Sequence, residues 1–395
     1  MTESISVSKR LEGNRDDDSA REFRTLIGEH RGPWYVGIDL GDKTSRVCVF
    51  DATSASPVTE GVIATRAADL AEWFSELGRL RIALEVGTHS PWISELLESF
   101  GHEVVIANPR KMESIHKNKR KNDRVDAKTL GRLLRADREL LHPVRHRGAE
   151  ARQDLTLLRA RDSLVTARTQ LINSVRGLVK SGGGRLPACS ADSFHKQAKK
   201  ELPSRLETAI LPLIKQIEAM TGQIREYDRS VRTLAEKKYG SETGGMRQID
   251  GVGALTSLAY VLTLDNPGRF RKSRDVGPYL GLVPKQDDSG ERRSQLGITK
   301  QGDTMVRRLL VTSAHYVLGP FGEDCDLRRW GLKIAARGGK NAKKRAVVAV
   351  ARKIAVLLHH LWVTGELYEP LHNSKLETER KGAAANKELA AENGL

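Results

Sequence analysis

The sequence predicts an α/β domain at the N-terminal side of the chain and long helices after it. Three observations predict this. Short apolar runs alternate with helical periodicity over residues 33–148, which is typical of a sheet covered by helices. Apolar residues repeat at heptad spacing over 149–240. Glycine turns separate amphipathic helices over 241–373. We expect residues 1–32 to form a disordered lead and 374–395 a flexible tail, because both are polar and lack a regular apolar pattern.

The composition indicates a partner that carries negative charge. The 395 residues include 66 Lys or Arg against 50 Asp or Glu, a net charge of +16, which favours nucleic acid over a merely basic protein. No run of 18 apolar residues is present and the first residues lack a signal-peptide core, so we expect no membrane span. Three widely separated cysteines form no paired spacing, which predicts a reducing, cytoplasmic location.

The first domain begins with a hairpin signal. Apolar residues 34–38 and 46–50 flank a polar turn, and three further strands and two helices follow them. The strands are predicted at 61–65, 81–86 and 103–107, and the helices at 67–77 and 90–100. Three meander-like strands followed by helix, strand, helix and strand predict a mixed sheet in the ribonuclease H-like order.

Four carboxylates stand at element ends in this domain. Asp39 and Glu85 close apolar strands, where an acid costs desolvation energy unless it has a partner. Asp123 and Asp126 lie three residues apart at the start of a predicted helix over 123–136, so they share one face. Taken alone, these two are explained as an N-cap and a dipole-favoured acid. If all four converge, hard oxygen ligands favour Mg²⁺ or Mn²⁺, and two such ions can activate a phosphodiester.

The motifs around these residues resemble those of a known family. They are Gly37-Ile38-Asp39, Glu85-Val86-Gly87-Thr88-His89, Asn108-Pro109 and Lys121-Asn122-Asp123-Arg124-Val125-Asp126-Ala127. They resemble the DEDD transposases of insertion sequences, the Piv-like recombinases of the family numbered one hundred and ten. The resemblance implies a first domain similar to the Holliday-junction resolvase RuvC. It also implies that Asp39, Glu85, Asp123 and Asp126 form its metal-binding tetrad.

The middle of the chain is predicted to be helical. Apolar residues recur every seven residues at Leu157, Leu164, Leu171 and Leu178, with Leu158, Val165, Ile172 and Val179 beside them. Gly182-Gly183-Gly184 ends that helix. A second helix is expected from about Pro203, with Pro212 bending it or delaying its start. Its apolar seam comprises Leu206, Ile210, Leu213, Ile217, Met220, Ile224, Tyr227, Val231 and Leu234. The two helices could form an antiparallel hairpin or pair between subunits, as a rigid spacer or a dimerisation element; the resemblance favours contact between proteins.

A glycine turn opens the third domain. Gly251 and Gly253 precede an apolar helix, so backbone N–H groups could hold a phosphate, as in a helix-hairpin-helix turn. A plain turn between two helices explains the same pattern.

Ser289 lies in a polar stretch that predicts a loop. The family resemblance extends here through residues 281–284, 289–290, 297–300 and 302–303. It implies that Ser289 is the nucleophile. Asp288 departs from the pattern, because many relatives carry a hydroxyl residue there.

Most of the excess positive charge lies in the third domain. Residues 337–345 are the densest part, and with an apolar helix over 346–362 and the ending 362–366 they resemble the subgroup numbered eleven hundred and eleven. Cations at these positions suggest contacts to phosphates. The candidate contacts over the whole chain are Lys119, Arg120, Lys121, Arg292, Arg293, Lys300, Lys340, Lys343, Lys344 and Arg345.

The resemblance implies DNA transposition through a phosphoserine intermediate. The partners would be donor and target DNA, a guide RNA encoded by the element, and further copies of the chain in a dimer or tetramer, next to the bacterial nucleoid. Three alternatives remain. A RuvC-like nuclease would use water as its nucleophile. A kinase of the actin-like fold is suggested by residues 37–41, although the charge and the heptads argue against it. A non-catalytic DNA-binding protein would follow if the four acids do not converge.

Overall fold

A computed structural model of the chain describes residues 16–29, 32–54, 56–109, 112, 123–289 and 292–376. Side-chain positions are described for these residues except 16–19, 29, 123–124, 286–289 and 292–295. The chain divides into two compact units, Met1–His146 and Arg147–Leu395. We describe each unit by itself.

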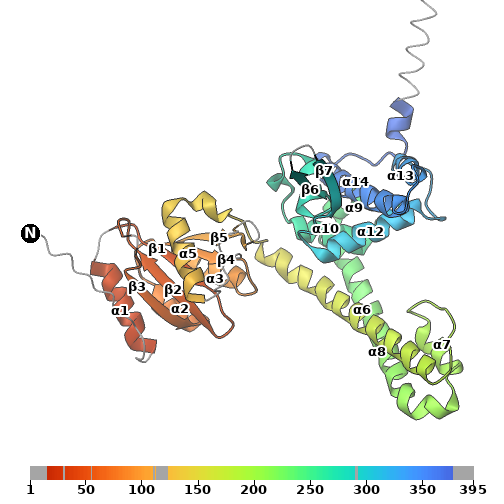
Figure 1. Ribbon diagram of the computed structural model, residues 1–395, viewed down its shortest axis with the longest axis horizontal. Helices are drawn as coiled ribbons and strands as arrows, with labels where there is room; N and C mark the ends of the chain where they lie inside the picture. Colours follow the sequence, from red (N-terminus) through yellow and green to blue (C-terminus); the bar gives the residue numbers. More distant parts are fainter. Residues whose placement is uncertain are drawn as a thin grey trace, which may run out of the picture. The chain divides into compact units, whose positions relative to one another are not determined.

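A five-stranded sheet forms the centre of the first unit (Figure 1). Its strands are β1 (Tyr35–Asp39), β2 (Thr44–Phe50), β3 (Thr59–Ala64), β4 (Arg81–Glu85) and β5 (Glu103–Ala107). The order is β3-β2-β1-β4-β5, with β1, β2 and β3 antiparallel and β1, β4 and β5 parallel. The predicted mixed sheet is therefore confirmed.

Helices cover both faces of this sheet. α2 (Ala67–Phe74) and α3 (Ser90–Ser99) cover one face, and α5 (Asp123–Ala136) covers the other. Side chains alternate between the faces along each strand. Thus Val36 and Ile38 belong to the core under α2 and α3, whereas Ala83 contacts the core under α5. A short 3-10 turn, Arg138–Leu141, follows α5.

The expectation of a disordered lead is wrong for residues 16–29, which form the helix α1 (Asp16–Glu29). Ala20, Phe23 and Ile27 are buried at helical spacing. The Phe23 ring lies 4.9 Å from that of Trp73 and 5.5 Å from that of Phe74, measured between centroids. Only one narrow face of this charged segment is apolar. Its helical periodicity is therefore too weak to predict a helix from the sequence alone.

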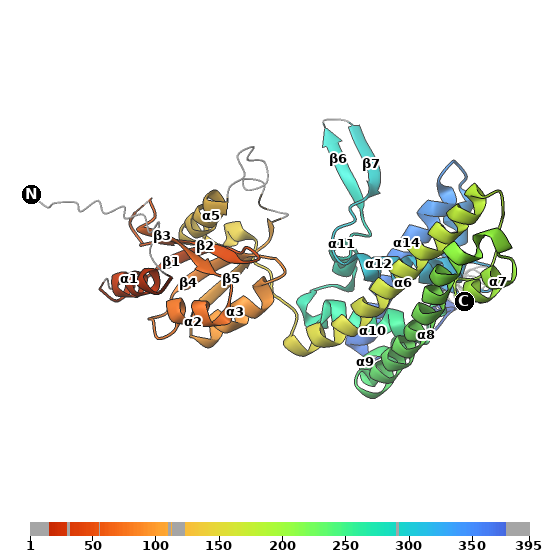
Figure 2. The ribbon, with the colours of Figure 1, turned by 90° about the horizontal axis from the view of Figure 1, so that it is seen from below.

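Two long antiparallel helices, α6 (Ala149–Ser181) and α8 (Glu207–Lys237), begin the second unit (Figures 1 and 2). The ion pairs Lys238–Asp154 (2.5 Å) and Arg161–Asp228 (2.6 Å) show the antiparallel direction, since residue numbers fall on one helix as they rise on the other. Of the two arrangements left open by the sequence, the chain forms the hairpin. Pairing between subunits stays a prediction.

The apolar seam of this hairpin differs in part from the predicted one. Leu178 is 49% exposed, whereas its neighbour Val179 is buried, as are Leu158 and Ile172. The seam on α6 therefore lies one residue further along than the leucine series. On α8 the structure buries four of the predicted positions together with three others: Ile210, Ile217, Ile224 and Val231, and Ile214, Thr221 and Ala235.

The tip of the hairpin contains elements that the sequence did not predict. α7 (Phe194–Lys200) packs there with a 3-10 turn, Ser204–Leu206, that precedes α8. Pro212 therefore falls near the beginning of α8. Phe194 and Ala198 give α7 too short an apolar stripe to be recognised before its partners are placed.

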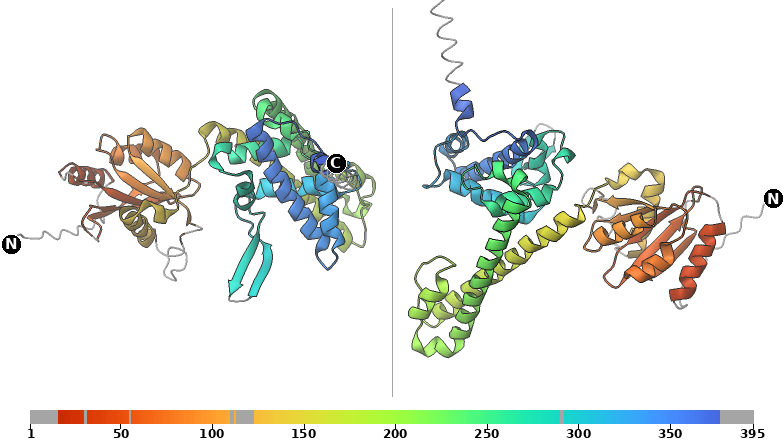
Figure 3. Two further views of the ribbon diagram at one scale, coloured as in Figure 1. Left: turned by 90° about the horizontal axis from the view of Figure 1, so that it is seen from above. Right: turned by 180° about the vertical axis from the view of Figure 1, so that it is seen from behind.

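The rest of the second unit is a helical body from which one hairpin of strands projects (Figures 2 and 3). Its helices are α9 (Gly240–Met246), α10 (Ala254–Leu264), α11 (Val276–Tyr279), α12 (Thr304–Leu318), α13 (Asp326–Ala336) and α14 (Ala342–Thr364). Its 3-10 turns are Pro267–Arg269 and Ser273–Asp275, and its strands are β6 (Pro284–Ser289) and β7 (Arg292–Ile298). The region is mostly helical, as predicted.

α14 is a core helix. Among the described residues it is the one helix long and apolar enough to cross a membrane, and half of its apolar window is buried inside the unit. Val350, Ile354 and Leu358 are fully buried, and the Tyr260 hydroxyl donates a hydrogen bond to the Ala355 carbonyl at 2.6 Å. The burial raises the pKa of Tyr260 well above its ordinary value. Burial in a folded core accounts for the apolar composition of α14.

We predict that Gly37→Ala destabilises the first unit by about 1–3 kcal/mol or more. A Cβ at Gly37 would lie 2.1 Å from the Ala127 carbonyl oxygen and 2.5 Å from the Gly131 nitrogen, so α5 would have to move off β1. Denaturant unfolding measures the change. Gly78→Ala is the control, because a Cβ there meets nothing within 4 Å. Equal effects of the two substitutions would contradict the close approach.

We also predict that acid loosens the contact between β5 and α2. His102 is buried; its Nε2–H donates to the Phe74 carbonyl at 2.8 Å, and its Nδ1 accepts from the Leu80 N–H at 3.3 Å. Burial lowers the pKa of His102 below 6.5. The unfolded chain therefore binds the proton more readily, and stability falls as the pH drops below about 6.5.

Hydrogen exchange of residues 103–107 between about pH 7 and pH 5 measures this effect. His102→Gln should flatten the pH dependence of the opening free energy, and His142→Asn, at an exposed histidine of the same unit, should leave it unchanged. An unchanged slope in His102→Gln would show that another group titrates.

Candidate active site

Asp39 and Glu85 end neighbouring parallel strands. Ile38 pairs with Leu84 in the register of β1 and β4, so the two acids follow side by side at the same edge of the sheet. Neighbouring strands lie about 4.8 Å apart. Both acids are half-buried. The sequence placed both at strand ends, and the sheet makes them neighbours.

Both acids face α5. A Cβ added at Gly37 would lie against the Ala127 carbonyl of α5, so this side of the strand faces α5. Ala83 packs against Leu130 of the same helix. Side chains two residues apart on a strand share a face. Asp39 and Glu85 stand two residues after Gly37 and Ala83, so they also lie on the face that α5 covers.

Asp126 reaches the same face from α5. It precedes Ala127, the residue in closest contact with Gly37, and it is 8% exposed. Asp123 lies one turn earlier on α5; its side chain is outside the described atoms. Three of the four predicted acids are thus brought to one face at the carboxyl edge of β1 and β4.

The donor set suits a hard divalent cation, which a DEDD transposase domain implies. Asp126 is buried on the sheet face that Asp39 and Glu85 share, and carboxylate oxygens are the ligands that such cations prefer. In the part of the chain with described side chains, however, no three His, Cys, Asp or Glu side chains lie close enough together to hold an ion. Asp123 and residues 113–122, which precede α5, are not in that part.

Sequence reasoning missed two residues at this edge. Arg46 of β2 lies directly opposite Asp39 in the sheet register, which places a cation beside the acid. His89 links the segments that follow β1 and β4, because its Nε2 lies 3.4 Å from the Asp42 carboxylate while its Nδ1 accepts a hydrogen bond from Trp92. Their position beside the two acidic motifs was the available signal.

Ser289 belongs to the second unit and stands at the end of a strand, not in a loop. It is the last residue of β6 and pairs with Arg292, the first residue of β7. The prediction of a polar loop is therefore wrong for residues 285–289 and 292–293, which belong to these strands. Two residues separate these strands, with glycine first, which is a hairpin signal that the charged composition concealed.

Glycines allow the two strands to meet at the foot of this hairpin. A Cβ at Gly281 would lie 2.2 Å from the Gln301 carbonyl oxygen, and one at Gly302 would lie 2.1 Å from the Tyr279 carbonyl oxygen. Both glycines have positive φ, +69° and +76°. The two glycine motifs on either side of Ser289 are thus explained by one close crossing of the backbone.

Arg307 fastens this crossing. Arg307 is only 9% exposed. Its guanidinium donates hydrogen bonds to the Leu280 carbonyl at 3.1 Å and to the Gln301 carbonyl at 2.7 Å. Asp303 accepts a hydrogen bond from the Val306 N–H and so caps α12, which carries Arg307. Ser289 is thereby held on a short arm with a rigid base.

The predicted nucleic-acid contacts are exposed where their side chains are described. These are Lys300, Lys340, Lys343, Lys344 and Arg345, the last three in the first turn of α14. The side chains of Arg292 and Arg293, and residues 119–121, lie outside the described atoms.

The glycine turn before α10 has a packing role of its own. Gly251 has φ +79°, and its carbonyl accepts a hydrogen bond from Ser313 of α12 at 2.6 Å. Gly253 is the N-cap of α10. The turn between helices is therefore real, and contact with a phosphate stays a prediction.

Two family models match the chain. A transposase model of the DEDD type found in IS110 elements matches residues 36–182, and a model of the transposase family IS116/IS110/IS902 matches residues 245–322. Between them they cover more than half of the chain, including every described candidate acid and Ser289. The chain is a DNA transposase. It belongs to the IS110 family.

Curated relatives agree over most of the chain. It is 28% identical over 345 residues to the transposase for insertion sequence element IS1111A of Coxiella burnetii, covering 84% of this chain and 90% of that protein. It is 26% identical over 347 residues to a probable family 20 transposase of Pseudomonas aeruginosa, covering 85% and 98%. It is 27% identical over 237 residues to the transposase for IS1328 of Yersinia enterocolitica, covering 59% and 69%.

We predict that Mn²⁺ or Mg²⁺ raises the melting temperature of the protein through this carboxylate group. A ligand that binds only the folded state at about 100 times its Kd contributes about 2.7 kcal/mol. The shift should disappear in Asp39→Asn and persist in Glu98→Gln, an exposed acid on α3. Thermal unfolding with and without the ion measures the shift in melting temperature. Equal shifts in both variants would place the ion elsewhere.

Proposed function

We propose that this transposase cuts and rejoins DNA with Ser289 as nucleophile and the carboxylates Asp39, Glu85, Asp123 and Asp126 as its metal-binding group. The observation that carries the proposal is that Asp39, Glu85 and Asp126 all lie on the sheet face that α5 covers. The strand order β3-β2-β1-β4-β5 supports a RuvC-like, ribonuclease H-like fold for this unit.

The four acids would hold one or two Mg²⁺ or Mn²⁺ ions, which would supply positive charge to a phosphate oxygen. The Ser289 oxygen forms a bond to the phosphorus and the bond to one sugar oxygen breaks, so that this oxygen leaves with a proton. The phosphoserine link keeps the energy of the original phosphodiester. A second sugar hydroxyl can therefore reverse the step on another strand and release Ser289 without a further energy source.

The arrangement of the hairpin supports the nucleophile's role. The glycine crossing and Arg307 fix the base of β6 and β7, while the far end carries Ser289 away from the helical body (Figure 2). Arg292 pairs with Ser289 across the hairpin and Arg293 pairs with Asp288, and both arginines would contact the DNA phosphates. A short arm of this kind can deliver the serine to a DNA strand bound at the metal-binding carboxylates, from the same copy of the chain or from another.

The partners proposed are donor and target DNA, a guide RNA encoded by the same element, and further copies of the chain in a dimer or tetramer. Sequence choice would then come from base pairing, while the protein contacts the backbone. The cations Lys119, Arg120, Lys121, Lys300, Lys340, Lys343, Lys344 and Arg345, with the turn at Gly251 and Gly253, would make those contacts. The α6–α8 hairpin would act as a coiled-coil dimerisation element, and the bacterial cytoplasm, beside the nucleoid, would be the site of action.

We predict that Ser289→Ala abolishes the covalent protein–DNA adduct and strand exchange while DNA binding persists. The reason is that alanine lacks the oxygen that attacks phosphorus but removes no charge. A denaturing gel with labelled donor DNA measures the adduct. Ser294→Ala, in β7 of the same hairpin, is the matched control.

Survival of the adduct in Ser289→Ala would assign the role to Ser294 or Ser273. Cleavage by the unchanged protein without any adduct would favour the RuvC-like alternative, in which water is the nucleophile.

A further inference from the structure

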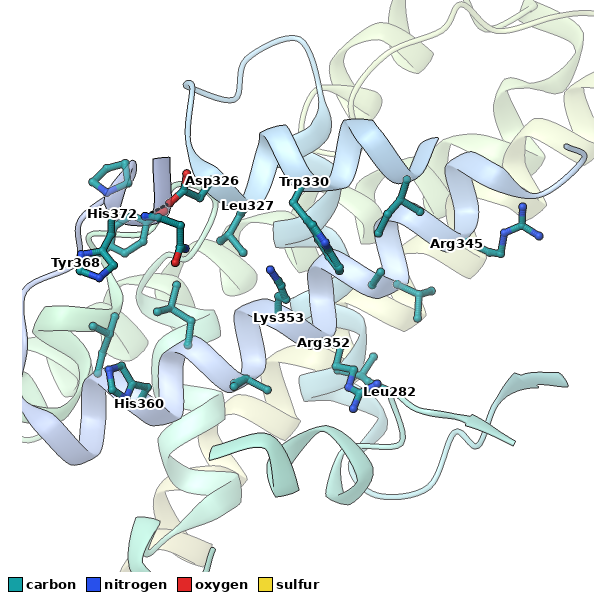
Figure 4. A pocket seen from close by; sticks show the side chains of 18 of the residues that line it. Leu282, Asp326, Leu327, Trp330, Arg345, Arg352, Lys353, His360, Tyr368 and His372 are labelled. Atoms are coloured by element: carbon teal, nitrogen blue, oxygen red, sulfur yellow. Dashed lines mark hydrogen bonds between the residues drawn. The ribbon is translucent and has the colours of Figure 1, made fainter. Parts of the chain in front are cut away.

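A large groove runs along α14 in the second unit. Its volume is 1550 Å³, above the range of about 300–1,000 Å³ typical of small-molecule sites, which favours a polymer as its occupant. α14 contributes a stripe along its length, α13 contributes Leu327, Trp330 and Ile334, and the foot of the serine hairpin contributes Leu296 and Ile298 (Figure 4).

The groove is strongly positive from one end to its middle (Figure 4). Arg337, Lys344, Arg345, Arg352 and Lys353 line it, and none of the five forms an ion pair with a carboxylate in the described part of the chain. The first turn of α14 contains no acid, although cations there oppose the helix dipole. Cations left without counter-ions around a hollow favour a ligand with several negative charges.

The acids of the groove lie at its other end and already have partners. Asp326 accepts hydrogen bonds from Ser374 (2.5 Å) and Asn373 (2.6 Å), which hold its pKa low in spite of its burial. Glu366 lies 3.0 Å from His360, and Glu369 lies 3.3 Å from His372. Figure 4 shows Asp326, His360 and His372 at this end and Arg345 at the opposite one. The positive end is therefore not neutralised from within the groove.

Apolar side chains line the groove beside these cations. Trp330, Ile334, Val356 and Leu357 line it, and the ammonium of Lys353 lies 4.2 Å from the centroid of the Trp330 ring. Phosphates alone would not require such a surface. The combination of cations with apolar and aromatic side chains suits single strands, whose unstacked bases need contact while their phosphates need charge. A duplex keeps its base faces stacked inside.

The groove also reaches the hairpin that carries Ser289. Pro284, Leu296, Gly297 and Ile298 line it at the hairpin foot. Ser289 lies five residues beyond Pro284 on β6, or about 17 Å at the rise of an extended strand. A strand that leaves the groove at this foot thus has only a few nucleotides to span before the serine.

We propose that this groove binds single-stranded DNA continuous with the strand that Ser289 attacks. The proposal rests on the proposed function in taking Ser289 as the nucleophile. Bases lie against Trp330 and the apolar lining, and phosphates lie against Arg345 and Arg352. The groove and Ser289 belong to the same unit. The groove therefore keeps the DNA strand that Ser289 attacks near the hairpin.

Binding of a fluorescent oligothymidylate of about 12 nucleotides to the full chain tests the proposal, because one single-strand site covers about 4–16. The double variant Arg345→Gln/Arg352→Gln should weaken binding about tenfold and reduce the slope of log K against log salt by about 1.4, at about 0.7 per phosphate contact. Trp330→Leu should weaken it about fivefold or more with an unchanged slope. Lys333→Gln, an exposed lysine of α13 outside the groove, should change neither.

Photocrosslinking of an iodouracil oligonucleotide to the unchanged protein gives a result that does not depend on how the variants fold. A crosslink on α13 or α14 at the groove supports the proposal, and crosslinks confined to other elements overturn it. Equal affinity for duplex, or dependence on these residues for RNA only, would also overturn it. If Ser289 forms its adduct normally and the groove variants bind the oligonucleotide as well as the unchanged protein, only the groove proposal is refuted. If binding depends on the groove residues but no adduct forms, only the serine mechanism is refuted.

Discussion

The close approach of α5 to β1 at Gly37 is the contact on which the candidate active site depends. The Ala127 carbonyl and the Gly131 backbone occupy the space that a side chain at Gly37 would need. Because α5 and β1 are this close, Asp126 of α5 lies over the edge where β1 and β4 end. Asp126 is buried there. A larger residue at position 37 would separate the helix acids from the strand acids without touching any of them. The glycine is therefore as much a part of the site as the carboxylates.

The hairpin that carries Ser289, the proposed nucleophile, depends on a similar close approach of the backbone. Gly281 and Gly302 let two backbone segments cross almost in contact, and Arg307 donates to the carbonyls on both. A two-stranded hairpin alone is marginally stable in water, so its orientation must come from its base. In both units, then, glycine permits a backbone contact that fixes where a candidate site residue is held. The proposed chemistry resides on side chains, but its geometry depends on positions that have no side chain.

Much of the first unit could be predicted because its signals are local. The short buried strands and the helix Asp123–Ala136 form at nearly the predicted bounds, and the positions of Asp39 and Glu85 at strand ends follow from those bounds. The misses share one physical cause. α1, α7 and the serine hairpin are short or highly charged, and their few apolar residues become informative only beside a partner, as Phe23 does beside Trp73. Arg46 could not be placed opposite Asp39 before the hairpin register was known.

The two faces of α14 show how function can be carried at the expense of local stability. Cations in its first turn oppose the helix dipole, which costs a few tenths of a kcal/mol to about 1 kcal/mol each. Its opposite face buries Val350, Ile354 and Leu358 completely, and burying one such side chain contributes about 1.5–3 kcal/mol. The core face therefore outweighs the electrostatic cost several times over. Because the helix is secured from behind, its exposed stripe is free to keep positive charge and apolar surface that a marginal helix could not tolerate, and those are the two properties that a single strand of DNA requires of its binding site.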